Sequence, residues 1–230
     1  MGNILITGTS SGLGFSLANV FKENGHNVYG ISRSKTGLGI KQIQCDFNNL
    51  DKVKNSIVEL IDINDFEYVI LNAGMLGKLD KQCNLSTKDY NEIFNVNVLS
   101  NKVILDFLMK ECNIQNVIGI SSGAALKTYF GWSLYCSSKA AFKQLISSYS
   151  DEFPDTRFLS LAPGIIKTKM QHNICNEDEG RIPSVKKFKE MYSTMDTPEH
   201  VANKIFNNLD KFNNVDSGEY LDMREILINK

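Results

Sequence analysis

The chain has 230 residues, of which 42% are hydrophobic and 22% charged, and its formal net charge is −1. This near-neutral balance gives no electrostatic reason to expect nucleic acid or an anionic membrane as a partner. No apolar run approaches the ~20 residues of a membrane span, and no signal peptide precedes the first strand-like run, so we expect a cytoplasmic protein.

Short apolar runs alternate along the chain with longer amphipathic stretches, a pattern typical of repeated β-α units. Runs that are apolar throughout, such as 68–71, fit strands covered by helices on both faces. Strands are expected at 3–7, 27–32, 41–45, 66–72, 114–121, 157–162 and 219–223. Helices are expected at 13–23, 50–63, 87–112, 135–152 and 198–211. The sequence therefore predicts an α/β protein, a single-domain Rossmann fold over 1–230 with a doubly wound parallel sheet of about seven strands.

The segment 167–197 breaks this alternation. It is polar and carries only a short helical pattern near 185–192. Long insertions of this kind are typically either functional or disordered. We expect a substrate lid, and a disordered surface loop is the alternative.

A glycine-rich turn follows the first strand and opens the first helix, with the spacing Gly-x-x-x-Gly-x-Gly. Glycines in this position let the backbone approach a pyrophosphate, which the helix N-terminus then stabilises. A plain β-α connection can also be rich in glycine and serine. The cofactor-binding residues expected here are Gly8, Ser10, Ser11, Gly12, Leu13 and Gly14.

The end of the second strand carries no acid. Binders of NAD usually place Asp or Glu there to accept from the ribose 2′-hydroxyl. This chain has Ser32, Arg33 and Ser34 instead. A guanidinium pairs well with a 2′-phosphate, so we expect NADP, the alternative being that Arg33 is an ordinary surface arginine.

Tyr135 and Lys139 are four residues apart, which places them on one face of a helix. Lowering the pKa of a phenol by three units needs roughly 4 kcal/mol. One ammonium ~4 Å away at an effective dielectric of ~20 supplies about that much. Beside a dinucleotide, this pair predicts transfer of a hydride and a proton to a carbonyl.

Seven short motifs are similar, in order and spacing, to those of the short-chain dehydrogenase/reductase family, over nearly the whole chain. They are Thr7-Gly8-x-x-x-Gly12-x-Gly14, Asp46, Asn72-Ala73-Gly74, Asn97, Ser122, Tyr135-x-x-x-Lys139 and Pro163-Gly164-x-x-x-Thr168. Within the family, the runs 121–125, 129–135 and 161–166 resemble the sepiapterin reductase and benzil reductase branch.

The resemblance implies a role for each matched residue. Tyr135 would protonate the carbonyl oxygen, Ser122 would hydrogen-bond it, and Lys139 would hold the nicotinamide ribose. Asn97 would bind a water that relays protons to Lys139, and Asp46 would accept from the adenine amino group. The other cofactor contacts implied are Phe47, Asn72, Ala73, Gly74, Pro163, Gly164, Ile166 and Thr168.

Aromatic residues crowd the approach to Tyr135, namely Tyr129, Phe130 and Trp132. They favour a flat or hydrophobic ketone or diketone, or alternatively they pack beneath the lid. The resemblance also implies a homodimer through the helices at 87–112 and 135–152. The apolar stripes expected at that interface are Phe94, Val98, Leu105, Phe142, Leu145 and Ile146.

These features together predict an NADPH-dependent carbonyl reductase that acts on a small molecule, without a metal. Two alternatives are a non-catalytic NADP-binding regulatory protein and an NAD-dependent alcohol dehydrogenase of the same family. A third, a sugar-nucleotide epimerase, usually has a different glycine spacing and a larger C-terminal domain.

Overall fold

The computed structural model describes residues 1–60 and 62–226. Within these residues, seven strands form one parallel sheet in the order β3-β2-β1-β4-β5-β6-β7. The strands are β1 (Asn3–Thr7), β2 (Asn27–Ser32), β3 (Lys41–Gln44), β4 (Asp65–Leu71), β5 (Asn113–Ile120), β6 (Arg157–Ala162) and β7 (Tyr220–Asp222). The strand order reverses between β1 and β4, and this reversal opens a crevice at the carboxyl ends of the strands.

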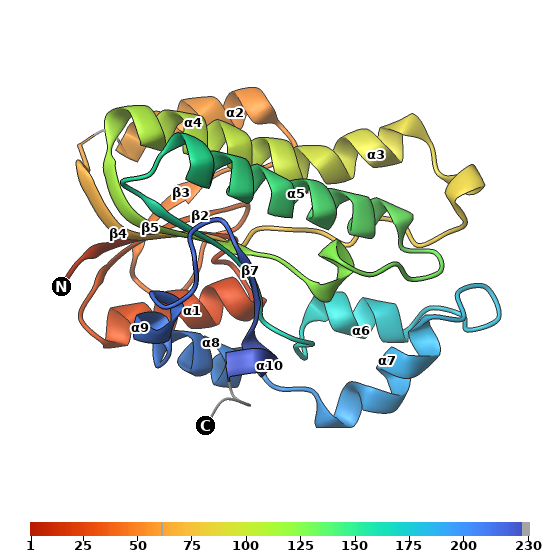
Figure 1. Cartoon of the computed structure of the whole chain (residues 1–230). Helices are drawn as coiled ribbons and strands as arrows, with labels where there is room; N and C mark the ends of the chain where they lie inside the picture. The colour runs from red at the N-terminus through yellow and green to blue at the C-terminus, as the bar shows by residue number, and fades with distance from the viewer. Residues whose placement is uncertain (61, 227–230) are drawn as a thin grey trace.

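Helices cover both faces of the sheet (Figure 1). They are α1 (Gly12–Glu23), α2 (Leu50–Ile57), α3 (Thr87–Phe94), α4 (Ser100–Glu111), α5 (Ser133–Glu152), α6 (Lys169–Cys175), α7 (Val185–Met191), α8 (Pro198–Phe206), α9 (Leu209–Phe212) and α10 (Met223–Ile226). Side chains of a strand alternate between faces, so Leu5 packs with α2, α4 and α5, while Ile4 and Ile6 pack with α1 and α8. The predicted doubly wound Rossmann fold is confirmed.

Local side-chain bonds fix where several helices begin. The Ser86 hydroxyl accepts from the backbone N–H of Asp89, whose carboxylate accepts in turn from the N–H of Ser86, a capping box that opens α3. At α8, the Thr197 hydroxyl accepts from the N–H of His200, and Pro198 occupies the first turn. None of the helices in residues 1–60 and 62–226 is long and apolar enough to cross a membrane.

The predicted strands agree with the structure to within one or two residues, but three helices differ. The helix expected at 198–211 is divided into α8, which ends at Phe206, and α9, which begins at Leu209. The helix expected at 87–112 is interrupted by a π-helical turn, η3 (Asn95–Leu99), between α3 and α4. The helix expected at 50–63 ends as an α-helix at Ile57 and continues as the 3-10 turn η1 (Val58–Leu60), and its residue 61 lies outside the described part of the chain.

The segment 167–197 holds α6, which was not expected, and α7, which agrees with the helical pattern near 185–192. Ile174 of α6 and Phe188 of α7 are buried in a third apolar cluster together with Trp132 and Leu134. Each of these helices has seven residues, fewer than two full turns. In α6, a pattern that short gives little periodicity to recognise in a sequence.

Candidate active site

A cavity of about 1120 Å³ lies at the carboxyl ends of the strands. It runs from the end of β2, past the turn after β1 and the end of β4, to the N-terminal half of α5 and the helices α6 and α7. Of the residues selected from the sequence, it is lined by Gly8, Ser10, Ser11, Gly12, Leu13, Ser32, Arg33, Phe47, Asn72, Ala73, Gly74, Ser122, Tyr135, Lys139, Pro163, Gly164, Ile166 and Thr168. Four selected residues do not line it: Gly14, Ser34, Asp46 and Asn97.

The turn between β1 and α1 is shaped for close approach to an anion. Gly8 and Gly12 have φ values of 76° and 60°, a left-handed conformation that glycine adopts without strain. Ser11 precedes α1 without a side-chain cap, and the first turn of the helix holds no acid. The free N–H groups of this helix end therefore attract negative charge into the cavity.

Gly14 packs α1 against the sheet instead of lining the cavity. A Cβ at this position would stand 2.4 Å from both Asn72 Nδ2 and the carbonyl oxygen of Gly8. The side chain of Asn72 is itself fixed, because its Nδ2 donates to the carbonyl oxygen of Thr7 at 2.9 Å. The Thr7 hydroxyl accepts from the N–H groups of Asn72 and Ala73, also at 2.9 Å, so the ends of β1 and β4 are held together.

We expect Gly14→Ala to lower the free energy of unfolding by about 1–3 kcal/mol, because the new methyl group forces α1 away from the turn. Gly37→Ala is a suitable control, because a Cβ at Gly37 would meet nothing within 4 Å. Urea denaturation of both variants measures the difference. Equal midpoints for Gly14→Ala and the unaltered chain would contradict the close packing.

The end of β2 presents Arg33 to the cavity, and Arg33 has no ion-pair partner in the part of the chain that the structure describes. The Ser32 hydroxyl is buried and points into the protein, where it donates to the carbonyl oxygen of Ser34 at 2.9 Å. Asp46 lies beside a second hollow of about 350 Å³, which Arg33 also lines. Its Oδ1 accepts from the N–H of Asn48 at 3.1 Å.

Tyr135 and Lys139 both line the cavity from α5, as the four-residue spacing predicts, and both are almost completely buried. Burial raises the pKa of Tyr135 to about 12, against a smaller opposite effect of the Ser122 hydroxyl. Burial also lowers the pKa of Lys139 to about 8. The expectation that Lys139 lowers the pKa of the phenol is therefore wrong for this structure. Lys139 Nζ lies 5.8 Å from the centre of the Tyr135 ring and donates to the carbonyl oxygen of Ile120 at 2.8 Å.

Asn97 lies behind the cavity, in the π-helical turn η3. Its Oδ1 accepts from the N–H of Met75 at 2.8 Å, and its Nδ2 donates to the carbonyl oxygen of Met75 and to Ser138 Oγ, both at 2.9 Å. A Cβ placed on Gly74 would stand 3.4 Å from Asn97 Oδ1 and 3.6 Å from Lys139 Nζ. The hydrogen bonds of Asn97 thus connect the segment after β4 to α5. Asn97 Oδ1 and the Lys139 ammonium both lie next to Gly74.

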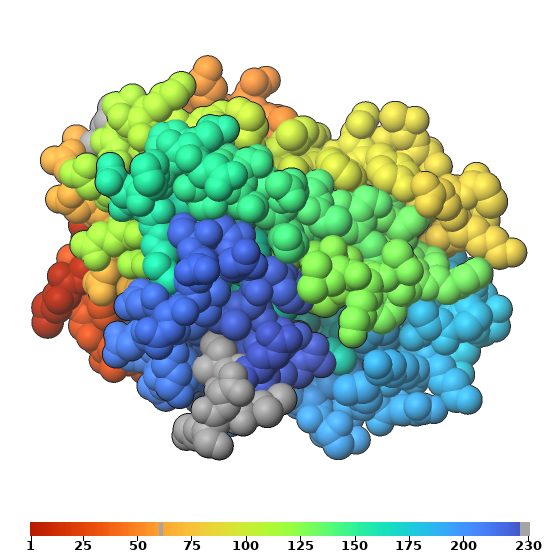
Figure 2. Space-filling model, viewed as in Figure 1, coloured from red at the N-terminus to blue at the C-terminus, as the bar shows by residue number. Residues whose placement is uncertain are grey.

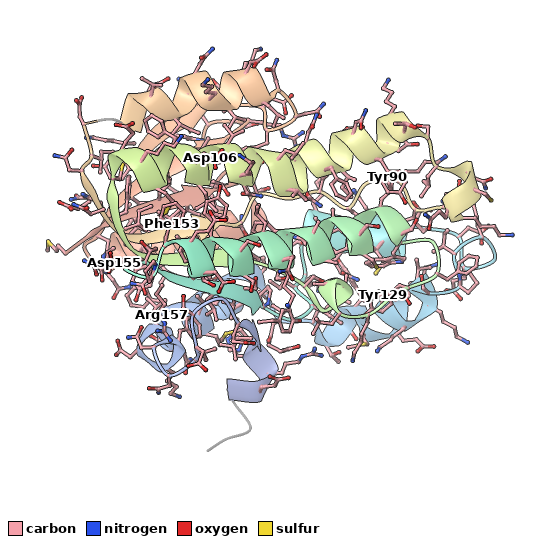
Figure 3. The ribbon with its side chains drawn as sticks, turned by 45° about the horizontal axis from the view of Figure 1, so that its top comes forward. Tyr90, Asp106, Tyr129, Phe153, Asp155 and Arg157 are labelled. Carbon is pink, nitrogen blue, oxygen red and sulfur yellow. The ribbon has the colours of Figure 1, made fainter. Side chains whose placement is uncertain are left out.

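The far end of the cavity has an aromatic wall, which we define as Tyr129, Trp132 and Phe188. The Trp132 and Phe188 rings are stacked with centroids 4.9 Å apart, and Trp132 meets Tyr135 edge-on at 6.1 Å. Figure 3 labels Tyr129, whose ring lies 5.8 Å from that of Phe188 on α7. Phe130 differs from the expectation, because it lies outside the cavity lining and is 48% exposed.

Sequence reasoning missed several residues of the cavity lining. Phe188 comes from α7, and only its three-residue spacing from Val185 could have marked both as apolar residues of one helix face. Tyr220, Asp222 and Arg224 come from the C-terminal end, where no motif was found. Arg224 Nε donates to Asp222 Oδ1 at 2.8 Å, which lowers the pKa of that carboxyl group.

The segment 167–197, light blue in Figure 2, lies beside the green segment that precedes α5. Arg181 Nη1 donates to the carbonyl oxygen of Leu79 and Ser184 Oγ donates to that of Phe130, both at 2.8 Å. Across the described ranges, no group of three or more His, Cys, Asp and Glu side chains is placed to hold a metal ion.

Comparisons with known proteins agree with this geometry. A family model described as short chain dehydrogenase matches residues 2–179. Benzil reductase ((S)-benzoin forming) of Bacillus subtilis is 27% identical over 97% of this chain and 98% of its own length. An NADP-dependent 3-hydroxy acid dehydrogenase of Schizosaccharomyces pombe is 28% identical over 92% of this chain and 88% of its own.

Among solved structures, the short-chain dehydrogenase/reductase YIR035C of Saccharomyces cerevisiae superposes with a TM-score of 0.85 at 22% identity. The match covers 97% of this chain and 96% of the other. At this low sequence identity, the structural similarity supports the fold and not a particular function. The family model spans most of the chain and includes Tyr135, Lys139 and the glycine-rich turn. The chain therefore belongs to the short-chain dehydrogenase family, and within it resembles the benzil reductase branch.

Proposed function

We propose that the chain is an NADPH-dependent carbonyl reductase that reduces ketones or diketones. The observation that carries this proposal is one continuous cavity with Arg33 at one end and Tyr135, Ser122 and Lys139 at the other. The charge and hydrogen-bonding groups along it suit a dinucleotide at one end and a carbonyl compound at the other.

The residues present fit NADPH. The open N-terminus of α1 and the turn from Gly8 to Leu13 suit the pyrophosphate, and a basic side chain stands at the end of β2 in place of an acid. Arg33 and Ser34 would hold the 2′-phosphate, Asp46 and Phe47 the adenine, and Asn72, Ala73 and Gly74 the adjoining ribose. Lys139 would hold the nicotinamide ribose, and Pro163, Gly164, Ile166 and Thr168 would border the nicotinamide. When bound, NADPH supplies the hydride.

The proton would come from Tyr135. A phenol with a pKa near 12 is fully protonated at neutral pH, so it is ready to donate to a carbonyl oxygen. Ser122 would donate a second hydrogen bond to the same oxygen. Lys139, with a pKa near 8, exchanges its proton readily at neutral pH and would return one to Tyr135. Asn97 would hold a water that relays protons to Lys139.

The aromatic wall indicates the kind of substrate. Tyr129, Trp132 and Phe188 offer flat apolar surface next to Tyr135, which favours an aromatic ketone or diketone. The name of the Bacillus subtilis relative, benzil reductase, supports the same class. A sepiapterin-like carbonyl compound is a second member of this class to test.

The experiment that tests this function follows NADPH oxidation with benzil, sepiapterin and simple ketones, and repeats each assay with NADH. We expect turnover with NADPH on the diketones. Turnover with NADH alone would favour an NAD-dependent enzyme of the same family. Tight NADPH binding without turnover of any ketone would favour the regulatory alternative.

Arg33→Asp should reverse the preference between the two cofactors. We expect it to weaken NADPH binding by about 10- to 100-fold, because a charge-assisted hydrogen bond contributes about 1.5–3 kcal/mol. Binding of NADH should be unchanged or improved, because the new carboxylate can accept from a ribose hydroxyl. Titration of protein fluorescence with each cofactor measures this change. Unaltered NADPH affinity would contradict the role of Arg33.

We also propose a cytoplasmic homodimer that pairs through α4 and α5, which run side by side on one face (Figure 3). Four residues of the expected stripes give no support because they are buried within the same chain, namely Val98, Leu105, Phe142 and Ile146. Support comes from the two stripe residues that stay partly exposed, Phe94 and Leu145, and from three further partly exposed apolar residues, Val103, Phe107 and Phe153. All five cysteines are free, which fits a reducing compartment.

A further inference from the structure

We infer that Gln42 of β3 is a positioning residue for recognition of the 2′-phosphate. It acts by fixing the backbone of residues 33–36, which we call the Arg33 turn. This inference rests on the proposed use of NADPH. It assigns the preference for that cofactor to a neighbouring strand as well as to Arg33 itself.

The carboxamide of Gln42 makes all its hydrogen bonds to the Arg33 turn and to the residue before it. Its Nε2 donates to the carbonyl oxygen of Ser34 at 2.7 Å and to Ser32 Oγ at 2.6 Å. Its Oε1 accepts from the N–H of Thr36 at 2.7 Å. One side chain therefore ties together Ser32, Ser34 and Thr36.

Gln44 reinforces the same arrangement. Side chains alternate along a strand, so Gln42 and Gln44 share one face of β3 while Ile43 between them is buried on the other. Gln44 Nε2 donates to the carbonyl oxygen of Arg33 at 2.9 Å. The carbonyl groups of Arg33 and Ser34 are therefore both directed towards β3.

This direction has an electrostatic consequence for the rest of the turn. No peptide bond in the described part of the chain is cis, and in a trans peptide the C=O and N–H groups point in opposite directions. The N–H groups of Ser34 and Lys35 are thus turned away from the two glutamines, and neither has an acceptor among residues 1–60 and 62–226. Successive free N–H groups form a concave binding place for an anion.

The charges near the turn agree with a phosphate at this place. Arg33 and Lys35 are both exposed and adjacent to the free N–H groups. The acid beside the neighbouring hollow, Asp46, shares that hollow with Lys52 as well as Arg33. If Gln42 released the turn, the carbonyl oxygen of Ser34 could rotate towards a bound phosphate and repel it. The glutamine bonds hold the negative ends of these peptides on the opposite side.

The test uses ligands that differ in the 2′-phosphate alone, adenosine 2′,5′-bisphosphate and AMP, titrated by calorimetry into the whole chain. We expect Gln42→Leu, which keeps the side-chain bulk, to bind the bisphosphate about tenfold more weakly and AMP as before, a change of about 1.4 kcal/mol. Gln44→Leu should show a smaller change of the same kind, because it removes one bond. Lys41→Leu, on the same strand, is the control and should alter neither affinity.

Each other outcome contradicts the inference in its own way. Equal weakening of both ligands would make Gln42 a general structural residue, and unchanged binding of both would remove its role. If the unaltered chain does not prefer the bisphosphate and Arg33→Ala changes nothing, the proposed NADPH specificity fails as well.

Thermal unfolding checks that Gln42→Leu is folded, and Gln42→Met serves as a second variant. With NADPH, the Michaelis constant should rise while the turnover number stays constant.

Discussion

Tyr135→Phe is expected to lower kcat/KM for diketone reduction by about 10³-fold, within the 10²–10⁴-fold range of a positioned general acid. The variant lacks only the phenolic oxygen. The ring should stay in place, because Trp132 meets it edge-on at 6.1 Å and burial holds it on α5. Affinity for NADPH should therefore change little. Initial rates with benzil and fluorescence titration with NADPH measure the two effects separately.

Tyr129→Phe is the matched control, because it removes a second phenol that lines the same cavity. We expect its activity to stay within a few-fold of that of the unaltered chain. If Tyr135→Phe kept more than a tenth of the activity, another group would have to donate the proton. If Tyr129→Phe were equally inactive, the loss would reflect the packing of the aromatic wall and not proton transfer.

Lys139→Met should make the protein more stable and inactive at the same time. Lys139 is 4% exposed. Among the residues that the structure describes, its ammonium has one hydrogen-bond partner, the carbonyl oxygen of Ile120, and forms no ion pair with an acid. A pKa lowered from 10.5 to about 8 corresponds to a cost of about 3 kcal/mol for the buried charge. Methionine fills similar space without the charge. We therefore expect a gain of about 1–3 kcal/mol at pH 7 by urea denaturation, with reduction lowered by at least about 10²-fold.

The pH dependence gives a second test of this explanation. The pKa of Lys139 is lower in the folded than in the unfolded chain, so between about pH 8 and pH 10.5 the unfolded chain binds more protons. Stability of the unaltered chain therefore gains from rising pH across this window. The advantage of Lys139→Met should be constant below pH 8 and shrink towards pH 10.5. An advantage that does not vary with pH would show that a buried charge is not its cause.

Most of the sheet could be predicted because most of its strands are short apolar runs that alternate regularly with amphipathic helices. The runs at 3–7, 27–32 and 157–162 match β1, β2 and β6. The same regularity explains why Gly8, Asn72, Ser122 and Tyr135 could be assigned to one site. The carboxyl ends of parallel strands meet at one edge of the sheet, so residues that follow different strands are brought together there.

Other features depend on contacts that a single sequence does not reveal. The π-helical turn at Asn95–Leu99 lies within an apolar pattern that reads as one continuous helix, and it accompanies the bonds of Asn97 to Met75 and Ser138. The raised pKa of Tyr135 could not be predicted, because burial is its main cause and the four-residue spacing does not show how deeply the phenol is buried. Gln42 reads as an ordinary residue of an edge strand until its bonds to the Arg33 turn are seen.

The reversal of strand order between β1 and β4 also bears on how such a protein diverges during evolution. The Arg33 turn depends on β2 and β3, whereas the aromatic wall depends on residues beyond Gly123. Mutations that change the coenzyme and mutations that change the substrate therefore fall on separate stretches of the chain. A descendant can therefore change its coenzyme preference while it keeps its substrate preference, or the reverse. A chimera of two such proteins joined within β4 should have the coenzyme preference of the N-terminal parent and the substrate preference of the C-terminal parent.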